Sequence, residues 1–241
     1  MVPGQPHGSH PAILVDLLLG AILLAGAAGG LRIGLDLPAG VLPLAVIAYA
    51  VLAVLLWRQR AGHALTPADR VTLGRATLVM LLIGLLPGAE LMAADPAPVF
   101  AFALAAALLD GVDGAVARRL HCETQAGARF DMEVDAVLLA VLALWVYALD
   151  RAGLWVIMIG LWRYLFVLGG WIQPALARAL PASQRRRVIC GIQAVGLALC
   201  IAPGLPSTVA TPMALALLVL VSYSFIIDAA FLWRNPDQGE E

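Results

Sequence analysis

Residues 110–135 read DGVDGAVARRLHCETQAGARFDMEVD, and this stretch carries four aspartates at spacings of three and four residues. The first pair is Asp110 and Asp113, and the second pair is Asp131 and Asp135. Residues three or four apart lie on one face of an α-helix, so each pair predicts two carboxylates that share a helical face. This concentration of acid stands out, because only 13% of the chain is charged.

The chain around this stretch is strongly apolar. Of its 241 residues, 62% are hydrophobic, and the mean hydropathy is +0.91. These values lie outside the range of soluble globular domains and predict an all-α integral membrane protein. The net charge of -1 carries little information about partners, and no nucleic-acid partner is expected.

Apolar segments recur at the length that crosses a hydrocarbon core of about 30 Å. Eight transmembrane helices are expected, at about residues 11–30, 39–57, 71–87, 96–117, 132–150, 153–175, 188–204 and 210–233.

The arginines predict the orientation of these helices, because basic residues in short loops stay on the cytoplasmic side. Only Arg32 and Arg151 fall in one set of loops, and Arg163 lies inside the sixth segment. The opposite loops and the C-terminal tail hold Arg58, Arg60, Arg70, Arg75, Arg118, Arg119, Arg129, Arg178, Arg185, Arg186, Arg187 and Arg234. Both termini are therefore expected in the cytoplasm, with the loop that contains Glu90 and Asp95 on the outer side.

The four aspartates are expected to converge near the cytoplasmic surface, because a short connection joins their two helices. Mutual repulsion makes such a cluster costly unless cations neutralise it. Oxygen ligands without His or Cys suit Mg²⁺ or Mn²⁺, and a magnesium site with few protein ligands often binds phosphates as well. Arg118, beside the acids, matches phosphate oxygens. The pattern favours transfer chemistry at a phosphate.

Other interpretations of these charges stay open at this point. The aspartates could form a structural ion network, or they could line an ion or proton pathway. Isolated acids such as Asp16 and Asp228 are expected to extend to the membrane interface instead of serving a site.

The stretch also resembles a family signature. It matches every fixed position of D-x2-D-G-x2-A-R-x8-G-x3-D-x3-D, which is typical of the CDP-alcohol phosphotransferase family, also called CDP-alcohol phosphatidyltransferases. The matching residues are Asp110, Asp113, Gly114, Ala117, Arg118, Gly127, Asp131 and Asp135.

The resemblance implies a six-helix catalytic core. It places the signature at the end of the second core helix and the start of the third. We therefore expect a catalytic membrane domain over residues 63–234, an additional transmembrane hairpin over residues 1–62 and a short polar tail over residues 235–241. Residues 11–57 match nothing in the core and are interpreted as lipid-facing packing.

Three other segments resemble the family at fewer positions. TPADRVTLGR carries Asp69, Thr72 and Arg75 where relatives have N, T and R in P-N-x-x-T-x-x-R. IGLWRYLFVL resembles a segment in which relatives often carry an inward arginine, here Arg163. PASQRRRVICGIQ resembles a loop with a basic residue six positions before a glutamine, here Arg187 and Gln193.

The resemblance implies a reaction between a CDP-linked donor, usually CDP-diacylglycerol, and an alcohol, which releases CMP in phospholipid biosynthesis. One or two Mg²⁺ or Mn²⁺ ions would be held by Asp110, Asp113 and Asp131, with Asp135 completing the metal site or lying beside it. Asp135 would also be the catalytic base. The implied CDP-binding residues are Asp69, Thr72, Gly114, Ala117, Arg118 and Gly127.

Arg163 and Arg187 are the candidates for acceptor binding, and their charge favours an anionic acceptor. Arg163 lies deep in its segment, so a structural ion pair with an aspartate is an equal alternative. A homodimer in a bacterial inner (plasma) membrane, with the active site open to the cytoplasm, completes the prediction. The alternatives are a nucleotide- or lipid-binding membrane protein without turnover and a carboxylate-lined cation carrier.

Overall fold

The computed structural model describes residues 10–60, 64–122, 124–173, 178 and 183–234, and every regular element in these ranges is a helix. Each of the eight predicted segments coincides with a helix. The long helices are α1 (His10–Gly34), α2 (Val41–Arg60), α3 (Pro67–Leu85), α5 (Ala97–Leu120), α6 (Gln125–Ala148), α7 (Ile157–Ile172), α8 (Gln184–Cys200) and α9 (Ser207–Arg234). Short turns of helix are η1 (Leu86–Gly88), α4 (Ala89–Met92) and η2 (Leu154–Val156).

Six of the described helical segments are long and apolar enough to cross a membrane, which makes the chain an integral membrane protein. They cover Ala12–Gly34, Val41–Gln59, Pro67–Met92, Ala97–Leu120, Leu154–Ile172 and Ser207–Arg234. The other two long helices differ in composition or length. α6 carries Arg129, Asp131, Glu133 and Asp135 in its first three turns, and α8 has only 17 residues with three arginines at its start.

The chain divides into two compact units, and each is described by itself. Unit 1 contains Met1–Ala94 and Ala101–Asp135, and unit 2 contains Asp95–Phe100 and Ala136–Glu241. α5 and α6 each contribute residues to both units.

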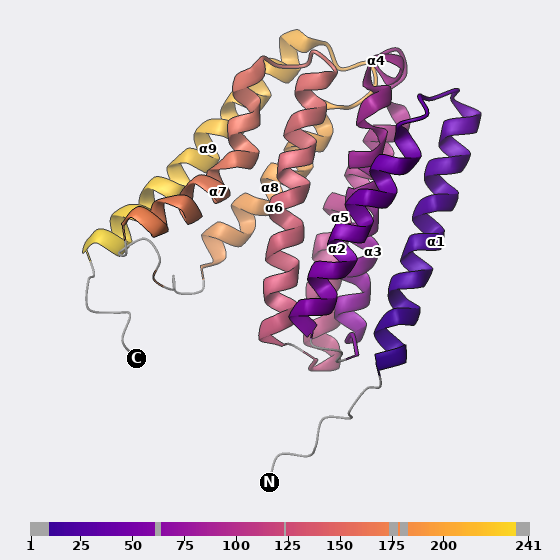
Figure 1. The fold of residues 1–241 in the computed structure, drawn as a ribbon. Coiled ribbons are helices and arrows are strands. Elements are labelled where there is room, and N and C mark those ends of the chain that lie inside the picture. The colour runs from indigo at the N-terminus through magenta and orange to yellow at the C-terminus, as the bar shows by residue number, and fades with distance from the viewer. Residues whose placement is uncertain (1–9, 61–63, 123, 174–177, 179–182, 235–241) are drawn as a thin grey trace. The chain divides into compact units, whose positions relative to one another are not determined.

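In unit 1, the three helices α1, α2 and α3 pack side by side (Figure 1). The hydroxyl of Tyr49 on α2 donates to the carbonyl of Leu17 on α1 at 2.9 Å. At Gly84 on α3, an added Cβ would overlap Ala45 on α2, so the two backbones approach closely only because this residue is glycine. The N-terminal hairpin is therefore packed directly on α3.

The start of α3 is defined by a capping box. Thr66 is the N-cap, and its Oγ1 accepts from the backbone N–H of Asp69 at 3.2 Å. The Thr66 N–H donates in return to Oδ2 of Asp69 at 2.8 Å. Pro67 occupies the first helical turn, where its missing N–H costs nothing. These contacts satisfy backbone donors that a helix start leaves without intrahelical partners.

In unit 2, α7 and α8 pack against α9. The rings of Trp162 on α7 and Phe225 on α9 stack with centroids 5.7 Å apart. The buried side-chain amide of Gln193 on α8 donates to the carbonyl of Leu217 on α9 at 2.8 Å. These contacts fix the long C-terminal helix against its two neighbours.

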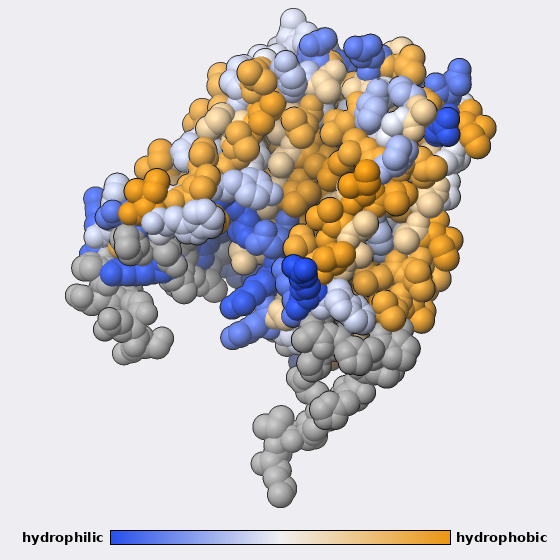
Figure 2. Space-filling view, viewed as in Figure 1, coloured by the Kyte–Doolittle hydropathy of each residue, from blue (hydrophilic) through white to orange (hydrophobic). Residues whose placement is uncertain are grey.

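The outward surface of the N-terminal hairpin is apolar. Leu18, Ile22 and Leu23 on α1 are each more than 60% exposed, and Figure 2 shows apolar side chains over the visible side of α1 and α2. Exposed apolar surface of this extent is expected where the solvent is lipid.

Candidate active site

Arg75 is the centre of a cluster of charges in unit 1. It lies on α3, and its side chain is fully buried. Its Nη1 donates to Oδ1 of Asp110 at 2.5 Å and lies 3.0 Å from Oδ1 of Asp135. Its Nη2 pairs with Oδ1 of Asp131. One guanidinium therefore joins carboxylates from α5 and α6 to α3.

The three carboxylates also lie close enough together to share a metal ion. One oxygen from each of Asp110, Asp131 and Asp135 lies within 4.8 Å of the others. Their side chains are 30%, 39% and 21% exposed, so the cluster is partly buried and still open to solvent.

The donor set of this cluster fits Mg²⁺ or Mn²⁺. All three candidate ligands are carboxylate oxygens, the type that hard divalent cations prefer. When ionised, the three aspartates carry three negative charges and Arg75 returns one positive charge. The net negative charge of these four side chains favours a divalent cation.

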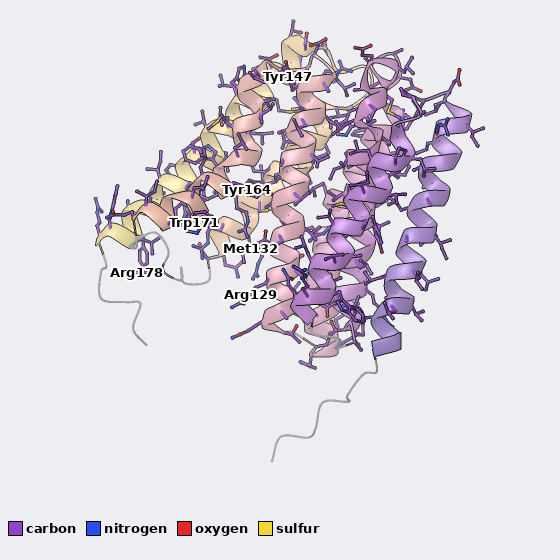
Figure 3. All side chains as sticks on the ribbon, viewed as in Figure 1. Arg129, Met132, Tyr147, Tyr164, Trp171 and Arg178 are labelled. Atoms are coloured by element: carbon purple, nitrogen blue, oxygen red, sulfur yellow. The ribbon has the colours of Figure 1, made fainter. Side chains whose placement is uncertain are left out.

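Three of the four aspartates that were expected to converge, Asp110, Asp131 and Asp135, lie together in the cluster. Asp131 and Asp135, four residues apart on α6, both reach Arg75. Arg129 and Met132, in the same turns of α6, are exposed (Figure 3). The first turns of α6 therefore carry exposed side chains as well as two members of the acidic cluster.

Asp113 was expected to complete the metal ligands. Its backbone lies in α5 one turn after Asp110, on the predicted helical face. Its side chain lies outside the described part of the structure. The role of Asp113 stays a prediction.

The expected CDP-binding residues lie on the same three helices. Thr72 is buried one turn after Asp69 on α3, and its hydroxyl donates to the carbonyl of Ala68 at 3.2 Å. On α5, the space beside Gly114 holds the guanidinium of Arg118, whose Nη1 would lie 3.3 Å from an added Cβ. Arg118 itself is exposed, and Ala117 is partly buried.

Gly127 lies in the first turn of α6. Its backbone N–H donates to Oγ1 of Thr124 at 2.9 Å, so Thr124 caps the helix that carries Asp131 and Asp135. The fifth predicted segment began at residue 132 and is therefore too short at its start. The helix starts at Gln125, because capping and not hydrophobicity sets its beginning.

The two candidate acceptor residues both belong to unit 2. Arg163 is half-buried in the middle of α7, and Arg187 is exposed in the first turn of α8. Asp228 on α9 lies 2.5 Å from Nη2 of Arg185 and 3.7 Å from Nη1 of Arg186. Of the run of three arginines, the structure therefore pairs two with a buried acid and leaves Arg187 exposed.

Asp16 and Asp228, which were expected to extend to the membrane interface, each form an ion pair with an arginine of another helix. Asp228 is 6% exposed and paired as described above, and Asp16 on α1 accepts from Nε of Arg70 at 3.0 Å. A carboxylate can form an ion pair with an arginine on a neighbouring helix instead of extending to water. The sequence of one helix does not show which helices are its neighbours.

The placement of Arg75 among the loop arginines was wrong, and Arg75 is the member of the candidate site that sequence reasoning missed. The residue lies two turns inside α3, and no expected site role was assigned to it. Two signals could have revealed it: a charge inside an apolar segment, and the three-residue spacing from Thr72, which continues one helical face.

A protein-family model described as CDP-alcohol phosphatidyltransferase matches residues 65–226, which is more than half of the chain. The match begins just before α3 and leaves the N-terminal hairpin uncovered. No curated protein and no solved structure gives a match. The chain belongs to the CDP-alcohol phosphatidyltransferase family, whose members are enzymes that transfer substituted phosphate groups.

Proposed function

We propose that the protein transfers a phosphatidyl group from a CDP-linked lipid, CDP-diacylglycerol in the first instance, to the hydroxyl of an alcohol and releases CMP. The observation that carries this proposal is the convergence of Asp110, Asp131 and Asp135 within 4.8 Å, in a chain of this family. The bond that forms joins the alcohol oxygen to the lipid phosphorus, and the bond that breaks joins this phosphorus to the CMP oxygen.

Asp110, Asp113, Asp131 and Asp135 would hold one or two Mg²⁺ or Mn²⁺ ions. When bound, such an ion stabilises negative charge on the diphosphate and on the leaving group. The close spacing of three of these carboxylates and their excess negative charge beside Arg75 support this assignment. Arg75 would be a positioning residue, because its guanidinium holds the three carboxylates from two helices in one place.

Asp135 would be the general base. Of the three carboxylates it is the least exposed, at 21%. It would take the proton of the acceptor hydroxyl as the oxygen attacks phosphorus, so that the nucleophile does not develop a positive charge. Asp69, Thr72, Gly114, Ala117, Arg118 and Gly127 would bind the CDP group. The small residues would allow close approach of the nucleotide, and Arg118, which is exposed, would contact phosphate.

The acceptor would be anionic. The exposed guanidinium of Arg187 and the partly buried one of Arg163 support this class, because arginine matches phosphate and carboxylate oxygens.

We further propose that α6 and α8 also cross the membrane, which gives eight spans. A cytoplasmic active site, cytoplasmic termini in a bacterial inner (plasma) membrane and a homodimer complete the proposal. The uneven distribution of arginines supports the orientation.

The experiment uses purified full-length protein with CDP-diacylglycerol, Mg²⁺ or Mn²⁺ and a panel of alcohols, and it measures CMP release. We expect release with one class of acceptor. Asp135→Asn should lower kcat by about 10²- to 10⁴-fold, the usual contribution of a general base. Glu133→Gln is the matched control, because Glu133 is exposed on the same helix and two residues from Asp135.

Each outcome of this experiment has a defined meaning. Turnover by Asp135→Asn equal to that of Glu133→Gln would remove the base assignment. CDP binding without CMP release for every acceptor would favour a binding protein without turnover. Metal flux into proteoliposomes without CDP-lipid would favour a cation carrier.

A further inference from the structure

A cavity lies in unit 1, between α1 and α3. Its volume is about 400 Å³, and we call it the α1–α3 groove. Phe102 of α5 also lines it, and most of its lining is aliphatic. The large apolar side chains that line it include Leu19, Leu23, Leu73, Leu78, Leu81 and Phe102.

One end of the α1–α3 groove is charged. Asp16 and Arg70 line it there and form an ion pair of 3.0 Å between Oδ2 and Nε. Asp16 is 13% exposed and Arg70 is 56% exposed. Among the described residues, the guanidinium of Arg70 makes no other hydrogen bond or ion pair, so its terminal N–H groups can bind an anionic oxygen.

The length of the groove matches one leaflet of a bilayer. Its lining runs from Asp16 to Ala27 on α1 and from Arg70 to Leu81 on α3. The first and last residues of each stretch are eleven positions apart, which corresponds to about 17 Å along the axis of an α-helix. Half of a hydrocarbon core of about 30 Å is about 15 Å. The charged end therefore corresponds to the headgroup level and the apolar end to the bilayer centre.

The α1–α3 groove is separate from the carboxylate cluster. Thr77 lines the groove, and Arg75, two residues earlier, points to the aspartates. Two residues correspond to about 200° around an α-helix, so these side chains lie on nearly opposite faces of α3. The groove also depends on α1, which lies outside the residues that the family model matches.

We propose that the α1–α3 groove binds one glycerophospholipid, with one acyl chain along the apolar lining and the phosphodiester on Arg70. The N–H donors of Arg70 match the phosphate oxygens. The aliphatic lining, about as long as one leaflet, matches the acyl chain. The N-terminal hairpin thereby supplies a lipid site that is distinct from the site of the proposed reaction.

Gly74 allows a direct test of this site. It lines the groove, and an added Cβ would meet no atom within 4 Å, so Gly74→Leu can place its side chain in the groove without a clash at Cβ. Gly26→Leu is the matched control, because Gly26 is exposed on α1, has equally open surroundings and does not line the groove.

The experiment titrates delipidated full-length protein in detergent with dioleoyl phosphatidylglycerol and counts bound lipid by native mass spectrometry, without metal or CDP-lipid. We expect one tightly bound lipid. Gly74→Leu should weaken its binding by about tenfold, because a few methylene contacts are lost. Arg70→Gln should weaken it by about tenfold through lost charge-assisted hydrogen bonds. Gly26→Leu should bind like the wild type.

Equal lipid binding in Gly74→Leu, Arg70→Gln and Gly26→Leu would overturn the proposal. The proposal would also be overturned if Gly74→Leu bound lipid like the wild type but changed from dimer to monomer. The groove would then be an interface between two copies of the chain. Thermal unfolding of Gly74→Leu in detergent, measured separately, reports whether the variant is folded. Because lipid is counted without substrates, failure of this proposal is distinguishable from failure of the proposed transferase activity.

Discussion

At the scale of single residues, Arg75 determines how the acidic cluster is built. A fully buried guanidinium is costly unless it is paired, and this one pairs with Asp110, Asp131 and Asp135. The same pairs relieve the repulsion among the three carboxylates. The arginine is therefore as much a part of the site as the aspartates of the signature.

Removal of the Arg75 charge should destabilise the protein. Arg75→Gln leaves three partly buried carboxylates without their shared cation, and we expect a loss of about 3–5 kcal/mol in the free energy of unfolding. Mg²⁺ should restore more stability in this variant than in the wild type, because a cation replaces the lost charge. Thermal unfolding in detergent, with and without Mg²⁺, measures both effects.

Arg129→Gln is the control for this measurement, because Arg129 is an exposed arginine on α6. Melting temperatures for Arg75→Gln and Arg129→Gln that agree within error would show that the ion pairs of Arg75 do not hold the cluster together.

At the scale of helices, the capping box of α3 gives Asp69 a structural role beside its proposed contact with CDP. Its carboxylate accepts from the N–H of Thr66 and its own N–H donates to the Thr66 hydroxyl. A carboxylate has further acceptor positions, so capping does not exclude a second contact. Substitution of Asp69 alone would mix the two roles.

A pair of variants separates the two roles of Asp69. Thr66→Ala and Asp69→Ala each remove one arm of the capping box, and each should lower the free energy of unfolding by about 1 kcal/mol. Only Asp69→Ala should also raise KM for the CDP-lipid. Thermal unfolding and steady-state CMP release test this. The same rise of KM in Thr66→Ala would assign the effect to the helix start and not to CDP contact.

The individual helices could be predicted from hydropathy, and their partners could not. Every apolar segment corresponds to a helix, but α6 starts at Gln125 because Thr124 caps it. The spacing of Asp131 and Asp135 was sufficient to predict a shared face. The ion pairs of Arg75, Asp16 and Asp228 depend on which helices are neighbours, and periodicity within one helix carries no information about that.

At the scale of the whole molecule, the proposed orientation can be tested from the membrane surface. The arginine distribution predicts that Glu90, near the outer ends of α3 and α5, lies outside, and that Arg119, at the end of α5, lies in the cytoplasm. In a variant without Cys122, Cys190 and Cys200, Glu90→Cys should react with an impermeant maleimide in intact cells. Arg119→Cys should react only after permeabilisation. The reverse labelling pattern would contradict the proposed topology.

Phosphatidyl transfer, as proposed, depends on a divalent cation bound by the carboxylate cluster. Direct Mn²⁺ binding to the purified protein, measured by isothermal titration calorimetry and by electron paramagnetic resonance, tests it without a need to know the acceptor. Loss of one carboxylate ligand should weaken Mn²⁺ binding in Asp131→Asn by about tenfold or more, since even the loss of a group that only orients a metal ligand costs about 10- to 100-fold in affinity. Glu133→Gln should bind Mn²⁺ like the wild type, and equal Mn²⁺ affinity in Asp131→Asn, Glu133→Gln and the wild type would show that the cluster does not bind the cation.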